Sequence, residues 1–104
     1  MTKRDRDPPP DVAPRSSPPR HPVLTPRCLA DLRHWIESQP RIALRLLDLM
    51  EACLRDPFGG TGKPERLKGD LAGLMSRRLT EADRLVYRVE GDRVVFLQAR
   101  YHYD

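Results

Sequence analysis

The sequence has no long apolar run. No stretch of it approaches the roughly 18 apolar residues that a membrane-spanning helix needs. The basic N-terminus leads into prolines at the place where a signal peptide would have its apolar stretch, so no secretion signal is expected. We therefore expect a cytoplasmic protein that does not act at a membrane.

Cysteine is scarce, and its placement does not suggest metal binding. Cys28 and Cys53 belong to no CxxC motif and have no histidine beside them, so neither a zinc knuckle nor a disulfide framework is indicated. We expect two reduced thiols in the core, no metal and no cofactor.

The chain is too short for two hydrophobic cores. Its 104 residues allow one domain at most, and therefore one functional site. The formal net charge of +4 favours a polyanionic partner such as RNA or DNA, an acidic protein, or a membrane surface. Charge alone does not choose among these partners.

Proline and charge dominate the N-terminal segment. Residues 1–22 hold seven of the eleven prolines, together with five Lys or Arg and three Asp. Such a composition buries too little apolar surface to offset the entropy of ordering the chain. We expect a disordered extension over residues 1–20, rich in proline and arginine, and a folded domain over residues 21–104.

Two helices are indicated in the first half of the domain. A short apolar strand at residues 23–24 precedes Thr25 and Pro26, which stand in the order of an N-cap and a first helical residue. Apolar residues then recur at helical spacing over residues 26–38, until Pro40 ends the run and opens a second helix. The turn residues at 56–60 end that helix.

The second half supplies strands. Residues 84–89 (RLVYRV) and 93–101 (RVVFLQARY) are rich in β-branched and aromatic residues, and residues 90–92 form a tight-turn signal. Residues 65–69 and 74–80 are weaker candidate strands. The sequence predicts an α+β fold of order β-α-α-β-β-β-β, in which an N-terminal strand and a helical hairpin pack on one face of a small antiparallel sheet.

The glycine-rich residues 59–65 (GGTGKPE) do not form a phosphate-binding loop of the Walker A type. The first glycine of that motif would fall at Pro57, and its Ser or Thr would fall at Pro64. Proline also lacks the backbone N–H that cradles a phosphate. Binding of a nucleoside triphosphate is not expected.

The polar residues of the second half contain the groups needed to cleave RNA without a metal. A carboxylate can accept the 2′-OH proton, guanidinium groups can stabilise the phosphorane, and an imidazolium can protonate the leaving 5′-oxygen. An ordinary solvated sheet face is the alternative, because about a third of the chain is charged. The residues concerned are Glu65, Lys68, Arg77, Arg78, Arg84, Arg100, His102 and Tyr103.

Residues 62–103 closely resemble the C-terminal half of the Txe/YoeB toxins, a branch of the RelE-like mRNA interferases. The segments GKPE.LK..L.G, SRR.T...RLVYRV and the terminal RYHY carry the resemblance in order and spacing. Residues 25–58 match the strand-helix-helix half of the family more weakly. The resemblance therefore covers about residues 22–103 and implies the RelE-like fold.

The resemblance also implies roles for single residues. Glu65 takes the position of the general base, and Arg84 that of the arginine that stabilises the transition state. His102 matches the general acid, and Tyr103 matches the residue that positions the phosphate. Lys68 and Arg78 match basic residues that hold the RNA backbone. We count Arg77 and Arg100 with them as candidate RNA-binding residues.

The same resemblance implies partners. Members of the Txe/YoeB family cut mRNA in the ribosomal A site without a metal. An antitoxin, usually of the Phd/YefM type, holds them inactive. Contact with operator DNA would then occur only through the antitoxin.

Two other functions stay open. The chain could be a degenerate toxin that only binds its antitoxin and nucleic acid, although such a protein would not need Glu65, Arg84, His102 and Tyr103 together. A general RNA-binding protein is less attractive, because exposed aromatic residues for base stacking are few.

Overall fold

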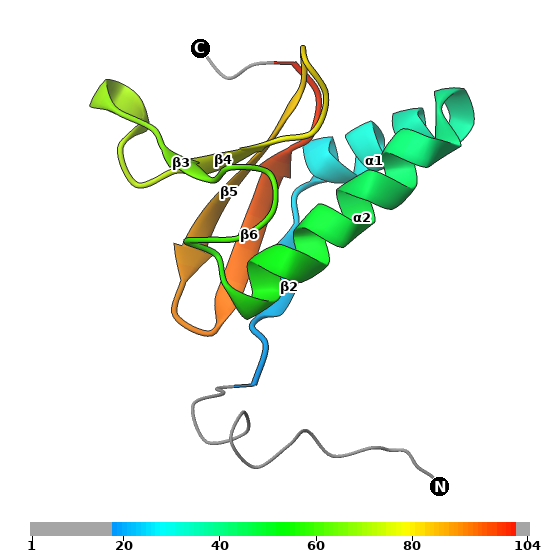
Figure 1. Ribbon diagram of the computed structural model, residues 1–104. Helices are drawn as coiled ribbons and strands as arrows, with labels where there is room; N and C mark the ends of the chain where they lie inside the picture. The colour runs from blue at the N-terminus through cyan, green and yellow to red at the C-terminus, as the bar shows by residue number, and fades with distance from the viewer. Residues whose placement is uncertain (1–17, 102–104) are drawn as a thin grey trace, which may run out of the picture.

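The computed structural model describes residues 18–101 (Figure 1). The predicted order of a strand, two helices and four strands is confirmed. Residues 1–17 of the predicted extension lie outside the described residues, so its disorder stays a prediction. The elements are β2 (His21–Leu24), α1 (Pro26–Ser38), α2 (Pro40–Arg55), β3 (Glu65–Arg66), the 3-10 turn η2 (Gly69–Leu71), β4 (Met75–Arg78), β5 (Arg84–Glu90) and β6 (Arg93–Gln98).

Local signals set the bounds of both helices as predicted. The Thr25 side chain accepts a hydrogen bond from the Cys28 N–H at 3.1 Å, so it satisfies a backbone donor that the first turn of α1 leaves free. The Thr25 hydroxyl also donates to the Leu97 carbonyl at 2.8 Å, which links the start of α1 to β6. Pro40 lies in the first turn of α2, where its missing N–H costs nothing.

The sheet has the strand order β2-β6-β5-β4-β3 within the described residues. The four strands from β3 to β6 form the predicted antiparallel meander. β2 pairs with β6 in parallel, with Val23 opposite Val95, so the sheet is mixed rather than purely antiparallel. A parallel pair needs a long crossover connection, and the helical hairpin and the other strands of the meander supply it.

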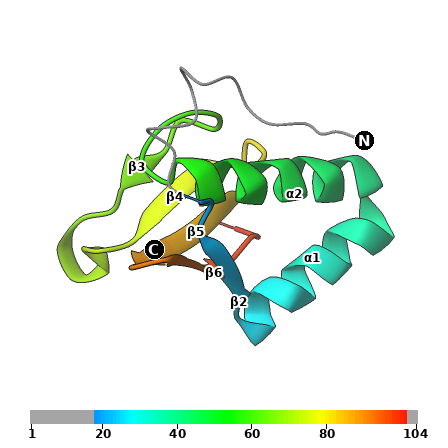
Figure 2. The same ribbon diagram turned by 90° about the horizontal axis from the view of Figure 1, so that it is seen from below.

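Both helices lie on the same face of the sheet (Figure 2). Leu46 and Leu49 of α2 pack in one buried cluster with Tyr87 of β5 and Phe96 of β6. Each fully buried side chain of this kind contributes about 1.5–3 kcal/mol through burial of apolar surface. In the part of the chain that the structure describes, no helix covers the opposite face of the sheet.

The last strand is shorter than predicted. β6 ends at Gln98, whereas the pattern of residues 93–101 predicts a strand through Tyr101. The physical reason is that two side chains of α1 hydrogen-bond to the backbone of Ala99. The Asp31 carboxylate accepts the Ala99 N–H at 2.8 Å, and the Trp35 indole N–H donates to the Ala99 carbonyl at 2.9 Å. A strand partner cannot use groups that are already bonded.

Both cysteines are free and buried, as predicted. Burial raises the pKa of the Cys28 thiol to about 12 and that of Cys53 to about 11. Neither thiol is therefore a reactive thiolate at neutral pH.

Candidate active site

Strand pairing brings two predicted catalytic residues onto the helix-free face. Glu65 in β3 lies directly opposite Ser76 in β4, and Ser76 lies opposite Val86 in β5. Because side chains alternate along a strand, Arg84, which lies two residues before Val86 in β5, shares its face. Glu65, Ser76 and Arg84 therefore project from three neighbouring strands onto one surface.

The Arg84 guanidinium connects the three strands. Its Nη2 donates to the Glu65 carboxylate at 2.8 Å, and its Nε donates to the Ser76 hydroxyl at 2.9 Å. The Arg84 side chain is only 15% exposed, whereas that of Glu65 is 64% exposed. The arginine is thus held in place, and the carboxylate remains open to a substrate.

Ser76 is a residue of this cluster that the sequence analysis missed. Its hydroxyl is buried and fixes the Nε end of Arg84. A signal for it existed, because alternation along β4 places Ser76 on the same face as Arg78.

Two further predicted RNA-binding residues are exposed, and one of them lies next to this cluster. Arg78 is directly opposite Arg84 in the register of β4 and β5, and its side chain is exposed. Lys68 is exposed at the start of η2, three residues after Glu65. Neither side chain hydrogen-bonds to another of the described residues, so both remain available for a phosphate backbone.

Arg100 lies outside the strands. The strand predicted over residues 93–101 would include it, but β6 ends at Gln98. Its guanidinium lies over the ring of Tyr101, 4.7 Å from the centroid, in a cation–π contact.

Arg77 is not on this face at all. It is counted with the RNA-binding residues in the sequence analysis, but its side chain points to the helix side and is fully buried. The alternation of Met75, Arg77 and Leu79 along the chain explains this orientation. We therefore correct its expected role: Arg77 is not exposed to RNA.

The Arg77 guanidinium instead fastens the loop between α2 and β3. It donates to the carbonyls of Thr61 at 2.7 Å, Asp56 at 2.6 Å and Gly59 at 2.8 Å. It also donates to the Tyr87 hydroxyl at 3.2 Å. The glycine-rich loop thus turns carbonyl oxygens toward a cation, which is the opposite of a phosphate-binding loop.

Tyr87 completes this buried arrangement. Its hydroxyl donates to the Pro57 carbonyl at 2.6 Å. Burial raises the pKa of Tyr87 to about 12, although the Arg77 hydrogen bond opposes the shift. The side chain therefore stays a neutral phenol.

His102 and Tyr103 lie outside the described residues, and their roles stay predictions. The structure does describe the residue before them. The Tyr101 N–H donates to the Asp83 carboxylate at 2.6 Å, and the Tyr101 carbonyl accepts from the Arg84 N–H at 3.2 Å. The peptide bond that leads to His102 therefore starts beside Arg84.

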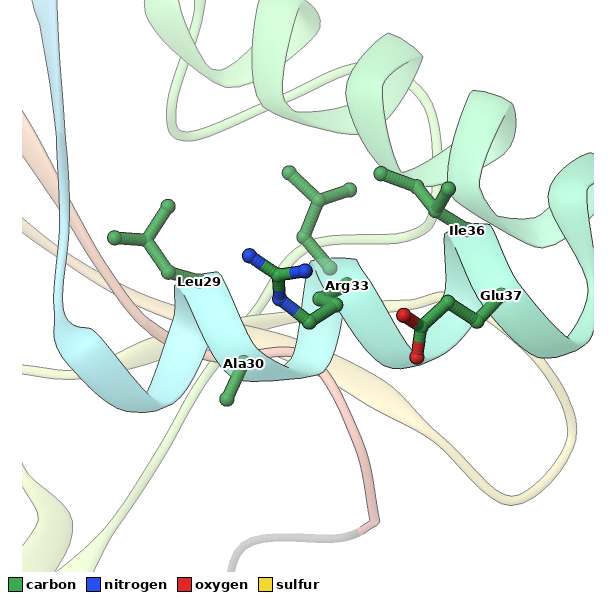
Figure 3. A pocket seen from close by; sticks show the side chains of 6 residues that line it. Leu29, Ala30, Arg33, Ile36 and Glu37 are labelled. Atoms are coloured by element: carbon green, nitrogen blue, oxygen red, sulfur yellow. The ribbon is translucent and has the colours of Figure 1, made fainter.

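An open apolar depression lies along α1 (Figure 3). Leu29 and Ile36, both about half exposed, line it together with Arg33 and Glu37. α1 packs on β2 and β6, whereas Glu65 lies on β3 at the other edge of the sheet. The depression and the Glu65–Arg84 cluster are therefore separate.

Residues 18–101 contain neither a metal-binding cluster of acidic, His or Cys side chains nor a membrane-spanning helix. No group of three or more His, Cys, Asp or Glu there is placed to hold a metal ion. None of the helices in that range has the length and apolar character required to cross a membrane.

Comparison with known proteins gives a consistent family. Residues 24–103 match the model of the YoeB-like toxin of bacterial type II toxin-antitoxin systems. The toxin YoeB of Streptomyces coelicolor is 51% identical over 73 residues, which cover 70% of this chain and 87% of that protein. The toxin YoeB of Escherichia coli K12 is 45% identical with the same coverage.

Solved structures agree. A YoeB/ParE toxin from Agrobacterium tumefaciens superposes with a TM-score of 0.75 at 41% identity, over 80% of this chain and 99% of that one. A YoeB dimer from Staphylococcus aureus superposes with a TM-score of 0.76 at 28% identity, and the match covers 83% of this chain and 100% of that one. A chain of the Staphylococcus aureus YoeB–YefM complex superposes with a TM-score of 0.73 at 28% identity, and the match covers 81% of this chain and 98% of that one. With its RelE-like fold and these matches, the chain belongs to the YoeB-like toxins of bacterial type II toxin-antitoxin systems.

Proposed function

We propose that this toxin is an endoribonuclease that cleaves mRNA at the ribosomal A site through its own side chains, without a metal. The observation that carries the proposal is the Glu65–Arg84 pair on the helix-free face, with Nη2 and Oε1 2.8 Å apart. A mostly buried guanidinium beside an exposed carboxylate suits a reaction in which negative charge grows next to a base.

The reaction would proceed by attack of a ribose 2′-oxygen on the adjacent 3′-phosphate. Glu65 accepts the 2′-OH proton; its Oε1 is held by Arg84, and Oε2 bonds to no other described residue. Arg84 has five N–H donors, of which Glu65 and Ser76 occupy two, so others can bond the phosphorane oxygens.

The leaving group takes the second proton. In this proposal the His102 imidazolium gives a proton to the departing 5′-oxygen, and Tyr103 positions the phosphate. The products are a 2′,3′-cyclic phosphate and a 5′-hydroxyl, so atoms and charge balance without a co-reactant. Lys68 and Arg78 bind the RNA backbone on either side.

The first test compares two glutamates. Ribosomes programmed with a defined mRNA are mixed with the wild type, with Glu65→Gln or with Glu81→Gln, and cleavage is followed by primer extension. Glu81 is exposed on the turn before β5, so its substitution makes the same change of charge outside the cluster. Loss of a general base should slow cleavage about 100-fold or more in Glu65→Gln only.

Induced expression of the same variants in bacteria provides a second readout. Growth arrest should follow expression of the wild type and of Glu81→Gln, but not of Glu65→Gln or His102→Ala. Equal toxicity of all four proteins would contradict the mechanism and favour a binding-only toxin.

We also propose that an antitoxin of the Phd/YefM type binds the chain. Support comes from the solved Staphylococcus aureus complexes of YoeB with YefM and from the net charge of +4, which suits an acidic segment. Co-purification of the toxin with the product of the neighbouring gene, and recovery of growth when both are expressed, would test this proposal.

A further inference from the structure

The turn between β4 and β5 holds the Asp83 carboxylate in a fixed orientation. The Asp83 carbonyl accepts the N–H groups of Leu79 and Thr80 at 3.0 and 3.1 Å. The Thr80 hydroxyl donates to Asp83 Oδ2 at 2.7 Å and accepts from the N–H groups of Ala82 and Asp83. One carboxylate oxygen is therefore committed to the turn.

The other oxygen reaches the C-terminal segment. Asp83 Oδ1 accepts the Tyr101 N–H at 2.6 Å, across 18 positions of sequence. The next residue, Arg84, donates its own N–H to the Tyr101 carbonyl at 3.2 Å. Asp83 of the turn and Arg84, the first residue of β5, thus bond both backbone polar groups of Tyr101.

These two hydrogen bonds hold Tyr101 in an unusual backbone conformation. Its φ is +64°, in the left-handed region that residues other than glycine seldom adopt. Such a conformation persists only where surrounding contacts hold it. The contacts here are the two hydrogen bonds to the turn and the Arg100 guanidinium over the ring.

We propose that Asp83 is a positioning residue for cleavage: it holds Tyr101, the residue before the proposed general acid His102, beside Arg84. The inference rests on the proposed function. Arg84 links the two parts of the proposed site, because its side chain hydrogen-bonds to Glu65 and its backbone N–H hydrogen-bonds to Tyr101. Asp83 touches no reacting atom and acts only through the backbone.

The position of Tyr101 can be measured without any cleavage assay. Hydrogen exchange of the Tyr101 amide should be at least tenfold faster in Asp83→Ala than in the wild type. Asp83→Asn keeps an oxygen that accepts the same N–H and should keep the protection. Glu81→Ala, which removes a carboxylate from the same turn without touching Tyr101, should match the wild type.

Cleavage is then measured with the same four proteins on programmed ribosomes. In Asp83→Ala, kcat should fall at least tenfold while KM stays within threefold, because RNA binding by Lys68 and Arg78 is untouched. Asp83→Asn should recover most of kcat, and Glu81→Ala should cleave like the wild type.

Thr80→Val controls for damage to the turn. It removes the hydroxyl that supports Asp83 Oδ2 but leaves the Oδ1 contact, so it should lose stability and keep kcat. The positioning role is overturned if Asp83→Ala cleaves like the wild type, or if Thr80→Val loses as much kcat. A wild type that does not cleave at all would overturn the proposed function instead, and the exchange measurement separates the two failures.

Discussion

Arg77 and Arg78 are neighbours in sequence that should respond in opposite ways to the same substitution. Arg77 is fully buried and fastens the loop between α2 and β3, whereas Arg78 is exposed beside Arg84. Methionine has a similar length and no charge, so Arg77→Met and Arg78→Met each remove a guanidinium with little change of volume.

The magnitude for Arg77→Met follows from its hydrogen bonds. Three loop carbonyls lose their donor, and an unsatisfied or water-exposed carbonyl costs about 1 kcal/mol each, or about 3 kcal/mol together. The Tyr87 hydroxyl loses a donor as well, while removal of a buried charge offsets part of the cost. We expect a net loss of about 3 kcal/mol in the free energy of unfolding.

Urea unfolding followed by circular dichroism measures this loss directly. In a thermal scan of a domain of this size, about 3 kcal/mol corresponds to a decrease in Tm of about 12–24 °C. Arg78→Met should stay within about 0.5 kcal/mol of the wild type and should raise KM for cleavage. An Arg77→Met protein that unfolds within about 1 kcal/mol of the wild type would refute our account of the loop.

Two other predictions concern backbone strain and pH. Gly62 and Gly73 both have positive φ, but a Cβ at Gly62 would lie 3.0 Å from Leu49 Cδ2, whereas one at Gly73 meets nothing within 4 Å. Gly73→Ala should therefore cost about 1–2 kcal/mol and Gly62→Ala clearly more, as urea unfolding would show; equal costs would contradict the packing. Burial raises the pKa of Cys28 from 9.0 to about 12 and that of Tyr87 from 10.0 to about 12. Between pH 9 and 12 the unfolded state therefore binds fewer protons than the native state. For each group that titrates only in the unfolded state, the free energy of unfolding should fall by about 1.4 kcal/mol per pH unit. Cys28→Ala should make this fall less steep, and an unchanged slope would contradict the assigned shift.

Much of the fold could be predicted because its signals are local. Thr25 and Pro26 mark the start of α1, Pro40 marks that of α2, and both marks depend only on neighbouring residues. The hairpin of β5 and β6 likewise follows from alternation and a tight turn. The end of β6 could not be predicted, because Asp31 and Trp35 act on Ala99 from more than 60 residues away.

The candidate site divides in a similar way. Glu65 and Arg84 were found by resemblance, and strand register explains why they meet. Arg77 and Arg78 carry the same charge in sequence, but they lie on opposite faces of β4. Alternation with Met75 and Leu79 would have placed Arg77 inside. Asp83 gave no sequence signal, because its partner is a backbone amide that any residue at position 101 except proline would supply.

The hydrogen bond from Trp35 to Ala99 also makes the protein its own optical probe. Trp35 is the single tryptophan of the sequence, its ring is buried, and its indole N–H is bonded to the carbonyl from which the terminal segment departs. Indole emission responds to the polarity and hydrogen bonding around the ring. Intrinsic fluorescence of the unlabelled toxin can therefore report when RNA or a partner protein displaces the end of the chain.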